Sequence, residues 1–391
     1  MKQQIGQTWD KWTRLTPPNA LYDRTLLWLY FGFLCFGLVA VTSASIPVST
    51  RLTGNAFYFT QKDLISILLS LVLFFVCVQL PIKQWEKYHA HLYLLALVGL
   101  ILVLLVGKSV YGAKRWISIA GFTFQPAEFA KFALSCYLAS FFVRKYDEMR
   151  QRPASCLRPL ALLFILGTFL LKQPDFGSTV VLFAITVGMF FIVGGKLKQF
   201  IFLGIAAVLG FAGLIFFEEY RLKRFLSFSN PFADIQNTGY QLAHSQMAFG
   251  RGEWFGEGLG NSIQKLDFLP EAHTDFVMSV VGEEFGFFGI CLVIFMLGAL
   301  IFRAFKIGKE SLLQEERFKG FWAMGIGIWI FLQGFVNLGV AIGLLPTKGL
   351  TFPLVSYGGS SLIIMSVAVA VLIRIDYENR LERGQAHPRE E

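Results

Sequence analysis

The chain has 391 residues, of which 55% are hydrophobic and only 16% are charged, and its formal net charge is +9 at pH 7. Soluble domains carry about 25% charged residues, so this composition excludes an ordinary soluble domain and predicts an all-α polytopic membrane protein. A positive net charge is also typical of nucleic-acid-binding proteins. Here, however, most basic residues flank apolar segments, as membrane topology requires, and we expect no nucleic-acid partner.

Ten apolar segments are candidates for transmembrane helices, because a bilayer-crossing helix needs about 20 mostly apolar residues. They are 25–45, 61–80, 91–107, 126–143, 157–172, 177–194, 199–217, 275–303, 319–344 and 351–375. The first follows a polar leader and has no small-residue cleavage site after it, so we expect a retained span and not a removed signal peptide. The predicted parts are a cytoplasmic segment 1–24, a membrane domain 25–375 and a cytoplasmic tail 376–391.

The positions of the basic residues predict the orientation. With the N-terminus in the cytoplasm, most of the 35 Lys and Arg residues fall in short cytoplasmic connectors, which satisfies the positive-inside bias. An even number of spans places both termini inside, and the long polar interval 218–274, between the seventh and eighth spans, lies outside. Cations such as Arg115 and Lys348 remain outside against the bias. They predict an anionic ligand, although anionic headgroups or nearby carboxylates would also explain them.

The long outer loop has two recognisable parts. Residues 237–249 are predicted to form a short amphipathic helix at the bilayer surface. Five glycines between 250 and 260 predict close backbone approach, either to a ligand or to the membrane domain. The five Cys residues show no CxxC spacing, so we expect neither a disulfide framework nor a metal site.

Asp275 is placed where this loop meets the eighth span. One interpretation is that it caps the helix, a role that Thr274 could fill equally well. The other is that it acts as a general base at the membrane interface, partly removed from water and close to cations. His273 is the alternative base, although a lone loop histidine is more often structural.

Ionisable residues also occur inside the predicted spans, where they usually pair or face a cavity because burying a charge in lipid is costly. Glu128 and Lys131 are three residues apart and share a helix face. They predict either a structural ion pair or the wall of a polar cavity that opens outward, and Asp175 adds a third carboxylate at a Pro- and Gly-broken connection. Glu283 and Glu284 are interpreted as structural or cavity-forming, with at least one of them protonated or salt-bridged.

Five separated motifs, in this order, together resemble the SEDS family (shape, elongation, division and sporulation). They are Gln-Pro-Ala-Glu-Phe-Ala-Lys (125–131), Gln-Pro-Asp-Phe-Gly (173–177), Gly-Arg-Gly-Glu-Trp-Phe-Gly (250–256), Leu-Pro-Glu-Ala-His-Thr-Asp-Phe (269–276) and Pro-Leu-Val-Ser-Tyr-Gly-Gly-Ser-Ser (353–361). The similarity covers residues 20–375. The forms of 271–275 and 347–351 are more similar to the division branch of the family than to its elongation branch.

The resemblance implies ten spans and a peptidoglycan glycosyltransferase of the bacterial inner membrane at the division septum. It implies polymerisation of lipid II with a class B penicillin-binding protein transpeptidase and other divisome proteins as partners. It places the essential carboxylate at Asp275, cavity residues at Glu128, Lys131 and Asp175, and further substrate contacts at Arg115 and Lys348.

The chemistry that fits this assignment is an inverting glycosyl transfer with release of undecaprenyl pyrophosphate. Pyrophosphate is a good leaving group, so one base, Asp275, and cations suffice, whereas a glycosidase needs a second carboxylic acid. Arg115, Lys131, Lys348 or a divalent cation (Mg²⁺ or Mn²⁺) would neutralise the pyrophosphate, and no organic cofactor is expected. Two alternatives are a transporter that flips lipid II along Glu128, Lys131 and Asp175, and a non-catalytic division scaffold.

Overall fold

The computed structural model describes residues 21–110, 113–119, 122–151, 157–216, 228, 230–237, 239–347 and 349–386. The predicted site residue Lys348 lies outside the described residues. So do most of the predicted segment 1–24, the end of the predicted tail, and residues 218–227 of the long loop.

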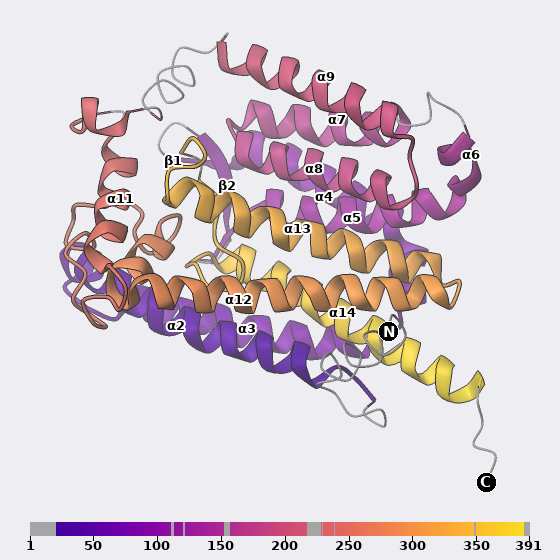
Figure 1. Cartoon of the computed structure of the whole chain (residues 1–391), viewed down its shortest axis with the longest axis horizontal. Helices are drawn as coiled ribbons and strands as arrows, with labels where there is room; N and C mark the ends of the chain where they lie inside the picture. The colour runs from indigo at the N-terminus through magenta and orange to yellow at the C-terminus, as the bar shows by residue number, and fades with distance from the viewer. Residues whose placement is uncertain are drawn as a thin grey trace, which may run out of the picture.

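Every predicted span overlaps a helix of the described chain, and these helices lie side by side in one bundle (Figure 1). They are α2 (Arg24–Thr53), α3 (Tyr58–Gln79), α4 (Ile82–Val106), α5 (Pro126–Arg144), α7 (Leu157–Lys172), α8 (Phe176–Ile192), α9 (Leu197–Phe216), α12 (Val277–Leu313), α13 (Arg317–Ala341) and α14 (Gly359–Ala386). Among the described residues, six helices are long and apolar enough to cross a membrane, namely α2, α3, α4, α12, α13 and α14. The fold is thus a mostly helical polytopic one, and the count of ten spans stays a prediction.

Local sequence accounts for several helix ends. The Asp23 carboxylate caps α2 by accepting from the backbone N–H groups of Thr25 (2.9 Å) and Leu26 (3.2 Å). Gly54 ends the same helix with φ at 72°, a left-handed conformation that glycine adopts without steric cost. Pro126 opens α5, where its missing N–H would have had no helical partner.

The connection between α4 and α5 departs from the all-α prediction. Strands β1 (Lys108–Val110), β2 (Ala113–Ile119) and β3 (Phe122–Phe124) form an antiparallel sheet in the order β1-β2-β3. In the second pairing Ile117 lies opposite Phe124. The segment is too short for another span, and its aromatic and β-branched residues favour an extended pairing. A short helix, α6 (Tyr146–Gln151), follows α5.

The predicted last span begins too early. Residues 351–358 are not helical, and α14 starts at Gly359. Pro353 interrupts the segment because it has no N–H to donate, and the Ser356 hydroxyl accepts from the Phe352 N–H (2.8 Å), which holds a local turn. This short loop therefore carries its polar groups at the end of the bundle where α14 begins.

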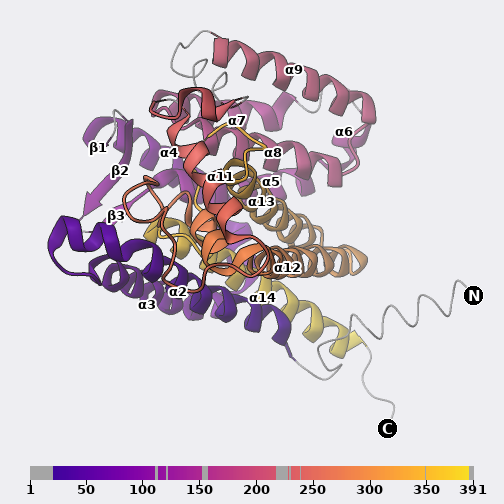
Figure 2. The same ribbon diagram turned by 60° about the vertical axis from the view of Figure 1, so that its left-hand side comes forward.

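The helix α14 is the centre of the bundle. Within its most apolar stretch 83% of the residues are buried, against 22% for α4 at the periphery. It packs against α2, α3, α4, α5, α12 and α13. The helix α11 (Tyr240–Gly252), which replaces the predicted helix 237–249, and the short helix η2 (Pro231–Asp234) lie beyond the end of the bundle, with α11 against α12 (Figure 2).

Two buried carboxylates on α12 fasten the long loop. Glu283 pairs with Arg251 (Nη1 to Oε1, 3.0 Å), and Glu284 pairs with Lys265 (Nζ to Oε1, 2.6 Å). Glu283 also accepts from the backbone N–H groups of Ile263 (2.9 Å) and Gln264 (3.2 Å), and Glu284 from the Ser43 hydroxyl. The prediction that at least one of the pair is salt-bridged is confirmed, because both are.

Candidate active site

A buried ion pair lies near the N-terminal end of α5. The Lys131 ammonium is 2.8 Å from Glu128 Oε1, and the two residues are 0% and 3% exposed. They lie one helical turn apart on the inward face. Solvent does not reach this pair, so the predicted cavity wall is closed at this point and the structural ion pair is what the structure shows. An unpaired charge at this depth would be costly, so each residue depends on the other as its partner.

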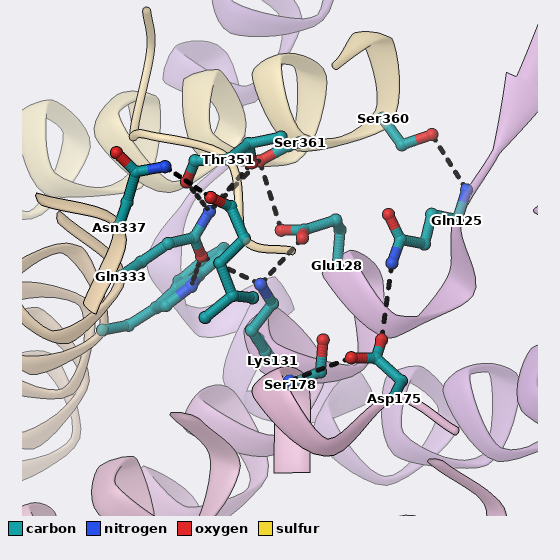
Figure 3. Close-up of polar contacts among 12 residues, drawn as sticks. Gln125, Glu128, Lys131, Asp175, Ser178, Gln333, Asn337, Thr351, Ser360 and Ser361 are labelled. Carbon is teal, nitrogen blue, oxygen red and sulfur yellow. Dashed lines mark hydrogen bonds and ion pairs between the residues drawn. The ribbon is translucent and has the colours of Figure 1, made fainter. Parts of the chain in front are cut away.

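Gln333 of α13 extends the pair into a network (Figure 3). Its Oε1 accepts from Lys131 Nζ (2.9 Å) and from the Trp329 indole N–H (2.8 Å). Its Nε2 donates to the carbonyl (3.2 Å) and hydroxyl (3.3 Å) oxygens of Thr351 and to the Ser361 hydroxyl (3.3 Å). The Ser361 hydroxyl in turn donates to Glu128 Oε2 (3.3 Å), which closes a ring. The loop before α14 is thereby joined to α5 and α13.

Asn337, one turn further along α13, fixes the backbone beside Asp275. Its Nδ2 donates to the carbonyl oxygens of Asp275 (2.8 Å) and Leu350 (2.6 Å). The Asn337 side chain is 1% exposed, and its Oδ1 has no hydrogen-bond partner among the described residues. A single buried amide therefore links α13, the start of α12 and the loop before α14.

Asp275 does not occupy the N-cap of α12. That position belongs to Phe276, which makes no side-chain capping bond, and the Thr274 hydroxyl donates to Glu271. The capping interpretation is therefore wrong for both residues. The Asp275 carboxylate is half-buried and lies against Gly349, where an added Cβ would be 2.7 Å from Oδ2. Any larger residue at 349 would displace the carboxylate.

Asp175 caps a helix and is connected through Gln125 to the start of α14. It caps α8, because its Oδ1 accepts from the Ser178 N–H (3.1 Å), and Oδ2 accepts from Gln125 Nε2 (3.4 Å). The Gln125 backbone N–H donates to the Ser360 hydroxyl (2.9 Å), at the start of α14. Asp175 is 2% exposed, so here too the predicted cavity residue is enclosed.

Arg115 lies on β2 and braces the connection between α7 and α8. Its Nε donates to the Gln173 carbonyl (3.3 Å), and its Nη2 donates to the Pro174 carbonyl. The side chain is half-buried. Arg115 is thus beside the backbone that leads into Asp175.

His273 has the environment of a structural residue. Its ring packs between Phe59 (centroids 4.7 Å apart) and Tyr357 (5.5 Å), and its carbonyl accepts from the Tyr357 N–H (3.0 Å). Burial lowers the pKa of His273, against an opposing effect of the Glu271 carboxylate. The neutral imidazole is therefore favoured, and the ring supports the loop that leads to Asp275.

The structure brings most of the predicted site residues close to α13. Glu128 and Lys131 are in direct contact, and Gln333 of α13 bonds to Lys131 while Asn337, one turn along the same helix, bonds to the backbone of Asp275. Asp175 and Arg115 lie together at the α7–α8 connection, and His273 is separate from both groups. The described residues bring no three His, Cys, Asp or Glu side chains together as metal ligands.

Four residues of the network were not predicted from the sequence: Gln333, Asn337, Thr351 and Ser361. The signal was present for two of them. Gln333 and Asn337 are four residues apart in an otherwise apolar helix, so they share one face, and amides inside a span normally point to protein or water. The two hydroxyl residues gave no such signal, because their roles depend on the loop before α14.

The arrangement can act on a hydroxyl group and an anion. A half-buried carboxylate at a fixed backbone position can accept a proton, as a general base must. A buried cation and several hydrogen-bond donors lie in the adjoining network, in surroundings where electrostatic interactions are strong.

Comparison with known proteins identifies the family of the chain. Residues 24–381 match the cell cycle protein family FtsW/RodA/SpoVE. The chain is 60% identical over 391 residues to a protein of Pasteurella multocida named "Probable peptidoglycan glycosyltransferase FtsW", with 99% of each chain covered. It is 49% identical over 372 residues to an Escherichia coli protein of the same name, covering 94% of this chain and 89% of that one.

Solved structures of related proteins share the fold. A chain from a structure described as "Structural coordination of polymerization and crosslinking by a peptidoglycan synthase complex" matches with a TM-score of 0.74 at 26% identity. The match covers 92% of this chain and 98% of that one. The Thermus thermophilus rod shape determining protein RodA matches with a TM-score of 0.66 at 26% identity, covering 93% and 99%.

Proposed function

The chain belongs to the FtsW/RodA/SpoVE family of cell cycle proteins, and from this membership we propose that it is a peptidoglycan glycosyltransferase that polymerises lipid II at the division septum. The identity to glycosyltransferases over nearly the whole chain supports the activity. The observation in the site that carries the proposal is the half-buried Asp275 carboxylate, whose backbone is held by Asn337 at the edge of a polar network.

In the proposed reaction, Asp275 accepts the proton of the C4 hydroxyl of an acceptor sugar. That oxygen forms a bond to C1 of the donor sugar while the bond from C1 to the pyrophosphate oxygen breaks, so the anomeric centre is inverted. Undecaprenyl pyrophosphate leaves with the electron pair of the broken bond. A positioned general base contributes about 10²–10⁴-fold to such a rate.

Cations on the outer side stabilise the charge that develops on the pyrophosphate. Arg115, half-buried at the α7–α8 connection, is the first candidate for this cation. Lys348, which lies outside the described residues, is the second candidate. Lys131 is already bonded to Glu128 and Gln333, so it contributes its field from within the network. The described residues bring together no group of three His, Cys, Asp or Glu side chains, and the proposed reaction takes no step through Mg²⁺ or Mn²⁺.

The proposed setting is a complex in the inner membrane. The similarity to a chain of a peptidoglycan synthase complex supports a class B penicillin-binding protein as the transpeptidase partner. We place the carboxylate site and the long loop on the outer side of the membrane, where lipid II and the partner's soluble domain would meet them, and both termini in the cytoplasm.

The test compares wild type with Asp275→Asn, each purified with the transpeptidase and incubated with lipid II and a divalent cation. Asn keeps the size of the side chain but cannot act as a base. We expect glycan-chain formation to fall about 10²–10⁴-fold. Asp267→Asn is the matched control, because Asp267 is an exposed carboxylate of the same loop that pairs with Arg51 at the surface. It should keep the wild-type rate.

Equal rates for wild type and Asp275→Asn would remove Asp275 from the chemistry. No polymer from either protein, in a preparation that binds lipid II, would contradict the transferase proposal and favour transport or scaffolding.

A further inference from the structure

The helix α12 is divided into two parts at Gly286. From Val277 to Glu284 every residue is buried beneath the loop, whereas Phe287 (52% exposed) and Phe288 (54%) begin an exposed apolar face. Gly286 itself has non-helical torsion angles, with φ at 65°. Only the second part of this helix can therefore face lipid.

The length of the second part matches a bilayer. Between Phe287 and Lys306 the helix rises about 29 Å at ~1.5 Å per residue, and a hydrocarbon core is about 30 Å thick. The exposed side chains over this stretch are large and apolar, with Phe295 74% exposed. The outer boundary of the hydrocarbon core therefore crosses α12 close to Phe287, and not at Asp275.

The tip of the long loop is fixed at this same level. The Phe287 N–H donates to the Glu253 carbonyl (2.9 Å) and the Phe288 N–H to the Trp254 carbonyl (3.2 Å). On the other side of the break, the N–H of Glu257 donates to the Glu283 carbonyl (3.0 Å). These backbone bonds between two segments set the depth of the tip relative to α12.

Glycines make this close approach possible. An added Cβ at Gly286 would lie 2.4 Å from the Gly256 nitrogen and 2.7 Å from the Gly252 oxygen. An added Cβ at Gly252 would overlap the carbonyl oxygen of Gly282. Real Cβ atoms do not approach so closely, so the contact depends on glycine at these positions.

Two aromatic side chains project from the tip. Trp254 is 61% exposed and Phe255 is 80% exposed. The Trp254 ring contacts the Phe287 ring (centroids 5.2 Å apart), and the Phe255 ring contacts the Phe288 ring (5.1 Å). The aromatic pair thus continues the lipid-facing surface of α12 at its outer edge.

We propose that Trp254 and Phe255 form an interfacial anchor that inserts into the outer leaflet at the level of the headgroups and the first acyl carbons. Aromatic side chains are enriched at this depth because their rings suit the boundary between water and hydrocarbon. Exposed carboxylates at Glu253 and Glu257 flank the pair and prevent deeper insertion, since a charge inside the core is costly. The anchor holds the long loop, which leads to Asp275, at the membrane surface. This role does not depend on which reaction takes place at Asp275.

A protein helix is the other possible occupant of this surface. Lipid is favoured because the aromatic pair is continuous with the apolar face of α12 and lies at the depth that the helix length sets. A protein partner at this position would exclude lipid from Trp254, and the experiment below distinguishes the two.

The test measures the depth of Trp254 in lipid nanodiscs of phosphatidylcholine brominated at the 6,7 or the 11,12 acyl carbons. The protein has eight Trp residues, so the emission of Trp254 is taken as the difference between wild type and Trp254→Phe. We expect strong quenching of this difference by the 6,7-brominated lipid, weaker quenching by the 11,12-brominated lipid, and little by aqueous iodide. A Trp introduced at the exposed Asn261, in a Trp254→Phe background, is the control and should respond to iodide.

Quenching of Trp254 by iodide and not by brominated lipid would overturn the proposal and leave the tip open to a protein in the aqueous phase. A second pair of variants tests the anchor itself. Phe255→Asp should reduce lipid quenching of Trp254, and Phe255→Leu should preserve it. Identical quenching in both variants would contradict an anchoring role for the pair.

Discussion

Asn337 places the strongest local constraint on the candidate base. Its two donated hydrogen bonds reach the carbonyls of Asp275 and Leu350, which belong to segments 75 positions apart in the chain. Without the amide, two buried carbonyls would lose their partner, at a cost of about 1–3 kcal/mol each. Asn337 is a positioning residue because it acts on the backbone of Asp275 and not on the substrate.

We predict that Asn337→Leu lowers kcat for polymerisation by about 10²-fold, the size of effect that a displacement of about 1 Å produces. KM should change little because the substituted side chain is buried away from the substrate. Asn337→Gln retains an amide and should recover part of the rate. Steady-state kinetics on folded protein provides the measurement, and a change confined to KM would contradict the positioning role.

His273 predicts a pH dependence of stability. Burial lowers the pKa of its imidazole below the ordinary value of 6.5, so the unfolded chain binds a proton more readily than the folded one. The corresponding stability is fully present above about pH 6.5 and is lost as the pH falls through the lowered pKa. The neighbours of the ring are Phe59, Tyr357 and the Glu271 carboxylate.

The melting temperature of wild type should therefore fall between pH 7 and pH 5, and His273→Gln should reduce that slope. Thermal unfolding in nanodiscs at several pH values measures both. Parallel slopes for wild type and His273→Gln would show that the residue does not titrate on unfolding.

At the scale of elements, α12 acts both as a span and as the support of the loop. Its outer part is held by the Arg251–Glu283 and Lys265–Glu284 pairs and by backbone bonds on either side of Gly286. Because the helix continues past the break, these contacts join the loop directly to the span. The same helix begins next to Asp275, so the loop contacts also position the candidate base.

Gly286→Ala should separate the loop from α12. Residue 286 has φ at 65° and ψ at -163°, a conformation that essentially only glycine adopts and that costs an L-residue about 1–3 kcal/mol. The new Cβ would also overlap the Gly252–Gly256 backbone. We expect a lower melting temperature and faster proteolysis within the loop. Gly298→Ala, on the same helix with no heavy atom within 4 Å of the added Cβ, should be neutral or stabilising. Equal protease sensitivity of the two variants would argue against the coupling.

At the scale of the whole molecule, polar groups from α5, α12, α13 and α14 meet at one end of an apolar bundle. Hydrogen bonds in such a setting are strong, and leaving one unmade is costly. The polar network therefore fixes how these helices sit relative to one another, while the surrounding apolar contacts supply most of the buried area. We interpret this end as the outer one from the basic residues at the opposite end.

The ten predicted spans and the basic residues between them predict a topology with both termini in the cytoplasm, which reporter fusions can test. Alkaline phosphatase is active only outside the cytoplasm, so truncated fusions after Gln173 and after Gln236 should be active, and fusions after Arg150 and after Lys198 inactive. A fluorescent protein at the C-terminus should be fluorescent in the cytoplasm. An inactive fusion after Gln173 would mean that α7 does not cross the membrane and would contradict the count of ten spans.

The sequence was sufficient to predict a mostly helical membrane protein and the approximate positions of its main helices, except that the last one begins at Gly359 and not at residue 351. Apolar length is a local property, so it can be counted along the chain. Glu128, Lys131, Asp175 and Asp275 stood out for the same reason, because charged residues within or beside apolar segments are rare. The five motifs predicted the family, and the family model and the relatives confirm it over almost the full length of the chain.

Tertiary structure alone decided how these residues are used. Whether Glu128 and Lys131 line an open cavity or pair with each other depends on Gln333 and on Ser361, which come from two other helices. Whether Asp275 caps a helix depends on where α12 begins, and Asn337 reaches it only because α13 packs beside that start. Hydrogen bonds between distant segments form only when packing brings them within about 3 Å, and no local pattern in the sequence records that distance.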